Sequence, residues 1–82
     1  MNQGKYTIKT TDLSTYMVTS VISLHRSRAY ETLAALGYPD KVIVRAFERD
    51  TRSGYLDWGV SVTRPFLTRE GEAYLRAAPR VD

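Results

Sequence analysis

Residues 41–47 read KVIVRAF and residues 55–63 read YLDWGVSVT, and these two segments carry the clearest structural pattern in the chain. β-Branched and aromatic residues dominate both segments, and the charged segment 48–54, ERDTRSG, separates them. This arrangement is typical of two antiparallel strands joined by a loop. The sequence therefore predicts a long β-hairpin over residues 41–63.

One register of this hairpin satisfies both of its faces. Val44 then lies opposite Trp58 on one face, and Arg45 lies opposite Asp57 on the other. The apolar side chains of the predicted inner face are Val42, Val44, Ala46, Leu56, Trp58, Val60 and Val62. Because the two faces agree on one pairing, we expect the hairpin to form the main sheet of the fold.

Helices are predicted on both sides of the hairpin. Residues 28–36 have Ser27 as an N-cap and Gly37 just past their end, which are typical helix boundaries. After the hairpin, Thr68 is in a position to cap a last helix that ends before Pro79. Both helices are expected to pack against the sheet.

Residues 12–24 fit both a helix and a strand. Five apolar residues fall at helical spacing behind Asp12, which would cap the helix, but Val, Ile, Thr and Ser are poor helix formers. These five are Leu13, Tyr16, Met17, Val21 and Leu24. We prefer the helix because the run from Ser20 to Ile22 breaks a strict alternation, and the strand remains the alternative.

The expected fold class is α+β, in a single domain that spans residues 1–82. In order, it has a short N-terminal strand at residues 5–9, two helices, the long β-hairpin and a C-terminal helix. Gly71 lies within that last helix, where glycine is unfavourable. Either its backbone packs closely against the sheet, or another group approaches it there.

Composition narrows the classes of protein to which the chain can belong. With 43% hydrophobic residues among 82, it has enough apolar surface for one core. The absence of cysteine excludes disulfides and thiolate metal sites, and no signal peptide opens the sequence. The most apolar window, residues 16–24, is too short to cross a bilayer, so we expect a cytoplasmic protein without a membrane partner.

The residues that could carry catalysis form no recognisable centre. His25 is the only histidine, and no nucleophile or orienting carboxylate is evident beside it. Carboxylates occur in pairs, Glu48 with Asp50 and Glu70 with Glu72, but arginines separate them, which is typical of solvated surfaces with local ion pairs. We therefore expect a binding protein rather than an enzyme, with no cofactor and no metal.

Arginines gather at two places that could hold nucleic acid. The net charge is +3, Arg26 and Arg28 begin one predicted helix, and Arg49 and Arg52 lie in the hairpin loop. A helix start can enter a major groove while a loop reaches the neighbouring phosphates. The alternative is that the hairpin arginines merely offset nearby acids such as Asp57.

The order of segments resembles a winged helix-turn-helix domain over residues 25–78. The residues 33–37, LAALG, would end its recognition helix, residues 48–54 would be its wing, and residues 66–75, FLTREGEAYL, its closing helix. Two departures weaken the match. The chain has little room for the usual first helix, and the turn at residues 23–26 lacks the glycine often found there.

This resemblance implies binding to double-stranded DNA and a regulatory role in transcription or recombination, of the kind that small phage or mobile-element proteins have. It places four residues in the groove and two on the wing. The implied DNA contacts are Arg26, Ser27, Arg28 and Thr32 in the groove, and Arg49 and Arg52 on the wing.

A protein-binding adaptor or inhibitor is the alternative function. On the outer face of the predicted hairpin, Ile43, Phe47 and Tyr55 would form an exposed apolar strip edged by Arg45. Such a composition is favoured at protein interfaces, and a homodimer could use the same strip. A strand at residues 12–24 would favour this alternative, because the helix-turn-helix geometry would then fail.

Overall fold

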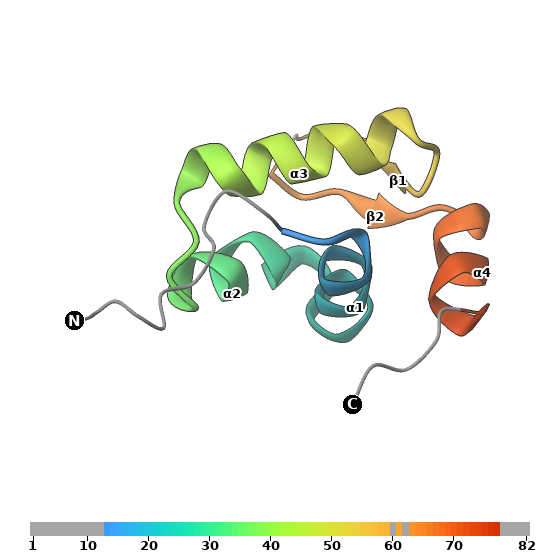
Figure 1. The fold of residues 1–82 in the computed structure, drawn as a ribbon, viewed down its shortest axis with the longest axis horizontal. Coiled ribbons are helices and arrows are strands. Elements are labelled where there is room, and N and C mark those ends of the chain that lie inside the picture. The colour runs from blue at the N-terminus through green and yellow to red at the C-terminus, as the bar shows by residue number, and fades with distance from the viewer. Residues whose placement is uncertain (1–12, 60, 62, 78–82) are drawn as a thin grey trace.

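Helices make up most of the described chain, together with one short antiparallel pair of strands (Figure 1). The computed structural model describes residues 13–59, 61 and 63–77. The elements in this part of the chain are α1 (Thr15–His25), the 3-10 turn η1 (Arg26–Arg28), α2 (Ala29–Ala35), α3 (Asp40–Arg52), β1 (Leu56–Asp57), β2 (Phe66–Leu67) and α4 (Arg69–Ala77). The strand predicted at residues 5–9 lies outside the described residues.

The first arm of the predicted hairpin is wrong, because residues 40–52 form the helix α3. Its buried residues are Ile43, Ala46, Phe47 and Asp50, which follow the i, i+3, i+4, i+7 spacing of one helical face. Burial of this face outweighs the low helix propensity of the β-branched run at residues 42–44.

A shorter hairpin forms downstream of the predicted centre. β1 and β2 pair in an antiparallel register, with Leu56 opposite Leu67 and Asp57 opposite Phe66. The predicted pairings of Val44 with Trp58 and of Arg45 with Asp57 are wrong, because residues 44 and 45 belong to α3. Val60 and Val62, expected on the inner face, are not among the described residues.

The preferred helix in the ambiguous N-terminal segment is confirmed as α1. Its N-cap is Ser14 rather than Asp12, since the Ser14 hydroxyl accepts a hydrogen bond from the Met17 N–H at 3.1 Å. The buried face differs in part from the predicted stripe. Val18 and Ile22 are buried, whereas Leu24 is 76% exposed.

The second predicted helix is confirmed as α2, although its start differs from the prediction. Ser27 lies in η1 and does not cap α2, whose N-cap position is Arg28 and carries no side-chain capping bond. The expected end is confirmed, because Gly37 follows the helix with a φ of +105°. Residues 36–39 then connect α2 to α3.

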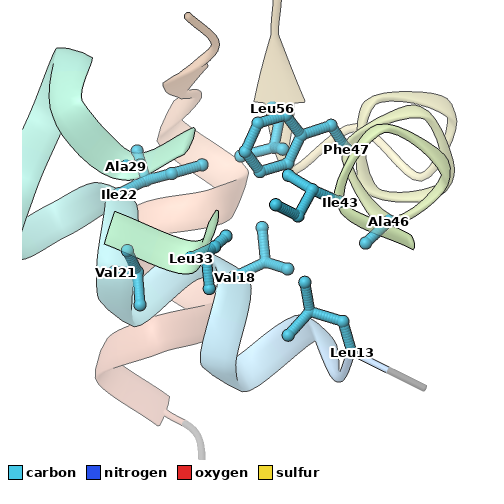
Figure 2. Close-up of a cluster of buried hydrophobic side chains, with 10 residues drawn as sticks. All are labelled: Leu13, Val18, Val21, Ile22, Ala29, Leu33, Ile43, Ala46, Phe47 and Leu56. Atoms are coloured by element: carbon cyan, nitrogen blue, oxygen red, sulfur yellow. The ribbon is translucent and has the colours of Figure 1, made fainter. Parts of the chain in front are cut away.

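One hydrophobic core joins α1, α2, α3 and β1 (Figure 2). Its members are Leu13, Val18, Val21, Ile22, Ala29, Leu33, Ile43, Ala46, Phe47 and Leu56. Phe47 and Ile43 point from α3 towards Val18 and Leu33, so the inner face of α3 is fixed by the first two helices. Each core side chain of this size contributes about 1.5–3 kcal/mol by leaving water.

The close packing expected at Gly71 is confirmed, and its partner is the backbone of Tyr55. A Cβ atom at Gly71 would lie 2.2 Å from the carbonyl oxygen of Tyr55. Thr68 caps α4 as predicted, since its hydroxyl accepts a bond from the Gly71 N–H at 3.0 Å. α4 is thereby attached to the segment that leads into β1.

Candidate nucleic-acid interface

The outer face of α3 carries a row of exposed charged side chains, here called the α3 stripe. Its members are Lys41, Arg45, Glu48 and Arg52. Spacings of four, three and four residues keep them within one narrow band of a helix with 3.6 residues per turn. The band extends over about 16 Å along the axis, at a rise of about 1.5 Å per residue.

The α3 stripe lies on a rigid support. It is diametrically opposite the buried face of α3, where Ile43 and Phe47 are fully buried in the core. Figure 1 shows α3 along one long edge of the molecule, with α1 and α2 packed against its inner side. Three cations are therefore presented outwards from an element whose position the core determines.

A buried carboxylate fixes the C-terminal half of α3. Asp50 is 0% exposed and accepts hydrogen bonds from Arg49 Nε and Nη2, both at 2.9 Å. The Thr15 hydroxyl of α1 donates to the same carboxylate at 2.8 Å. Charge-assisted, bidentate bonds of this kind are strong and directional, so they hold the Arg49 guanidinium beside the α3 stripe.

A shallow hollow of about 300 Å³ adjoins the α3 stripe on the side of α1. Arg45, Arg49 and Arg52 lie around it, together with Glu48, and Leu13 contributes an apolar wall. Because Arg49 and Asp50 offset each other as an ion pair, Arg45 and Arg52 against Glu48 leave a small net positive charge around this hollow.

The predicted DNA-contacting residues fall into two separate groups. Arg26 and Arg28 are exposed in η1 after the end of α1, whereas Arg49 is linked to the first turn of α1 through the bond between Thr15 and Asp50. The length of α1 alone separates the two places by about 15 Å. Arg49 and Arg52 are thus on α3, and their predicted location in a hairpin loop is wrong.

The other two predicted groove residues have modest roles in this geometry. Ser27 is exposed in η1 between the two arginines. Thr32 is half-buried on α2 and donates its hydroxyl to the Arg28 carbonyl at 2.9 Å. Thr32 therefore supports the start of α2.

The apolar strip predicted for protein binding does not exist. Ile43 and Phe47 are both 0% exposed, because they are core residues of a helix and not outer residues of a strand. Tyr55 is half-buried, and its ring packs against the ring of Tyr74 in a tilted arrangement with the centroids 4.9 Å apart. Of the four residues, Arg45 alone is exposed, and it belongs to the α3 stripe.

A hydrogen bond joins α2 to the beginning of α3. The hydroxyl of Tyr30 donates to the carboxylate of Asp40, and this bond raises the pKa of Tyr30 above its ordinary value of 10.0. Asp40 also lies in the first turn of α3, where a negative charge interacts favourably with the helix dipole. The start of α3 is therefore fixed next to α2.

Between β1 and β2, the described residues 58, 59, 61 and 63–65 include one exposed arginine. Arg64 is exposed, while Trp58 is half-buried. Gly59 has a φ of +65°, and a Cβ at this position would lie 3.0 Å from the ring of Phe66. The glycine thus allows the loop to turn closely over the Phe66 ring.

Sequence reasoning missed the element that presents these cations. Lys41 is absent from the predicted contacts, and Arg45 was assigned to the protein-binding alternative. The signal that identifies them is the amphipathic spacing of the buried residues Ile43, Ala46 and Phe47, together with Asp40 in the first turn. The β-branched run VIV at residues 42–44 was given more weight than that spacing, so the segment was predicted to be a strand.

Other kinds of site find no support in the part of the chain that the structure describes. There, no three histidine, aspartate or glutamate side chains come together as metal ligands, and His25 is exposed at the end of α1. Among residues 13–59, 61 and 63–77, no helix has the length and apolar character needed to span a membrane. A comparison of the chain with protein-family models, curated proteins and solved structures finds no match.

Proposed function

We propose that this chain binds double-stranded DNA as a winged-helix domain whose groove-entering helix is α3. Support comes from the order of elements: three helices, a two-stranded hairpin and a closing helix. In this reading α2 and α3 are the helix-turn-helix pair, joined by residues 36–39 with Gly37 at positive φ. Both departures noted in the sequence then disappear, because α1 supplies the first helix and Gly37 supplies the turn glycine.

The observation that carries the proposal is the α3 stripe. A major groove about 12 Å wide admits an α-helix, and lysine or arginine side chains on it can bind guanine edges and phosphates. Lys41 and Arg45 lie in the N-terminal half of α3, the half that reads bases in helix-turn-helix proteins. Arg52, about two turns after Arg45 on the same face of α3, is positioned for phosphate contact.

Residues outside α3 complete the proposed interface. The hairpin loop acts as the wing, with Arg64 as its phosphate contact. Arg28 is the N-cap residue of α2, and the bond between Tyr30 and Asp40 fixes α2 next to the start of α3, so we assign Arg28 as a second phosphate contact. Arg49 is held beside the stripe by its bonds to Asp50 and, as part of that ion pair, contributes guanidinium donors rather than net charge.

The role is one of binding rather than catalysis. By occupying a DNA site, the protein would control access of other proteins to it, which is the regulatory function in transcription or recombination that the resemblance implies. No cofactor takes part in this proposal.

Fluorescence anisotropy with labelled random duplex DNA tests the proposal. We expect the wild type to bind at low salt with a dissociation constant of about 10⁻⁴ to 10⁻⁶ M or tighter. Arg45→Ala and Arg52→Ala should each weaken binding several-fold, and each should make the plot of log K against log salt shallower by about 0.9 per lost phosphate contact.

Arg69→Ala is the matched control, because Arg69 is an exposed cation at the start of α4 and does not belong to the α3 stripe. Its affinity for duplex DNA should stay close to that of the wild type. No binding by the wild type at low salt would reject DNA binding altogether. An equal loss of affinity in all three variants would reject α3 as the contact element. Binding would then be explained by nonspecific attraction between the basic protein and DNA.

A further inference from the structure

A second surface lies where the end of α1, η1, β2 and α4 meet, and it is here called the α4 groove. It encloses about 670 Å³ and has an apolar floor that includes Ile22 and Leu75. Phe66 lies at its edge, and Arg26, Glu72 and Arg76 are its charged side chains. The hollow is large enough to accept an aromatic side chain from another molecule.

Phe66 is an exposed aromatic ring next to this hollow. It is 51% exposed, although rings of this size are usually buried. One edge of the ring lies close to Gly59 of the hairpin loop, which limits the positions that the ring can take. A ring fixed in an exposed position costs little conformational entropy when it is buried in a complex.

The three charged side chains of the α4 groove are available to a partner. Within the described residues, Arg26, Glu72 and Arg76 take part in no side-chain hydrogen bond or ion pair. They place both signs of charge on one surface, next to the hollow and the ring. A surface with both signs can pair with a copy of itself.

We propose that the α4 groove is the interface of a homodimer. In a two-fold symmetric contact the same patch of each copy meets the other, so the patch must supply both halves of every contact. The α4 groove does so: Phe66 of each copy fills the hollow of its mate, and Glu72 of each copy pairs with Arg26 and Arg76 of its mate. An acidic peptide would match the two arginines but would meet repulsion at Glu72.

The dimer leaves the α3 stripe accessible. The α4 groove is built from α1, β2 and α4, whereas the stripe points away from the core on the outer face of α3. Figure 1 shows α4 at the end of the molecule and α3 along its long edge. Self-association therefore does not rest on DNA binding, and each can be tested without the other.

Sedimentation velocity of the full chain over a wide range of concentrations measures the association. We expect conversion from a 9.3 kDa monomer to a species of twice that mass as the concentration rises. In a dimer of Glu72→Arg, three arginines of one copy would face three arginines of the other. We therefore expect this substitution to weaken self-association at least tenfold. Glu70→Arg, an exposed change on the opposite side of α4, is the matched control and should dimerise like the wild type.

A charge-exchange experiment tests the symmetry of the contact. Glu72→Arg makes the patch wholly positive, and the double variant Arg26→Glu, Arg76→Glu makes it wholly negative. Each should be monomeric alone, and an equimolar mixture should form a heterodimer. Phe66→Ala should also weaken the wild-type dimer at least tenfold, with circular dichroism showing that the variant is folded.

Two results would overturn the inference. In the first, the wild type sediments as a monomer throughout the concentration range. In the second, a dimer forms but both Glu72→Arg and Phe66→Ala leave it unchanged, which would place the interface on another surface.

Discussion

The most unusual single residue of the described chain is Arg26. Its φ of 54° and ψ of −121° lie in a region that L-residues other than glycine rarely adopt. The conformation closes α1, since the Arg26 N–H donates to the Ile22 carbonyl, and it turns the chain into η1. A non-glycine residue held in such a region costs about 1–3 kcal/mol.

Replacement of this arginine by glycine should therefore stabilise the monomer. For Arg26→Gly we expect the free energy of unfolding to rise by about 1 kcal/mol, because relief of strain exceeds the extra backbone entropy of glycine in the unfolded chain. Urea denaturation of dilute protein measures the change.

Arg28→Gly is the control, because Arg28 has an ordinary φ of −101°. It should be neutral or destabilising. Equal effects of the two substitutions would show that Arg26 is not strained. A stability gain in Arg26→Gly together with weaker dimer formation would indicate that the arginine is retained for its side chain.

Some residue positions were predictable and others were not, and the difference lies in the range of the interactions. Gly37 and Thr68 act through neighbours in sequence, so their roles at helix ends could be read directly. Asp50 lies in a charged run that is typical of a surface, yet it is buried. Its burial depends on Thr15, a partner 35 positions away that no local pattern reveals.

At the scale of elements, the misassignment of α3 shows how packing overrides propensity. The same residues that alternate well enough for a strand also fit a helix, because Ile43, Ala46 and Phe47 recur at helical spacing. A strand would bury alternate residues, whereas the core available beside α1 and α2 accepts one helical face. In α1 the same kind of conflict was resolved correctly, because the apolar spacing was given more weight than the β-branched residues.

The attachment of α4 gives a prediction at this scale. Gly71→Ala should destabilise the protein by about 2 kcal/mol or more, because the new Cβ would lie 2.2 Å from the Tyr55 carbonyl oxygen and α4 must shift. The gain in helix propensity from glycine to alanine, about 1 kcal/mol, opposes this loss without cancelling it.

Thermal unfolding followed by circular dichroism gives the measurement for α4. Glu70→Ala, an exposed substitution one residue earlier, should change stability by no more than about 0.5 kcal/mol. If Gly71→Ala were as stable as the wild type, the backbone of α4 could not be held against Tyr55 as described.

At the scale of the whole molecule, the basic charge is divided between surfaces that the sequence could not separate. The net charge of +3 and the clustering of arginines were evident from composition. The prediction that arginines form the candidate site could be made, but their grouping could not, because it depends on which helix each belongs to. Arg52 lies on the α3 stripe, whereas Arg26 lies in the α4 groove.

This division predicts how stability depends on protein concentration. If the α4 groove dimerises, unfolding of the dimer releases two chains, and above the dissociation constant each tenfold rise in concentration adds about 1.4 kcal/mol per dimer. For a chain of this size the melting temperature should then rise by about 3–5 °C per tenfold step. Glu72→Arg should show a melting temperature that is independent of concentration.

Lys41→Ala, on the α3 stripe, should keep the wild-type dependence but gain less stability from added duplex DNA. A flat profile for the wild type would contradict the dimer, and an unchanged gain from DNA in Lys41→Ala would contradict the assignment of α3, so the two surfaces are tested separately in one set of melting curves.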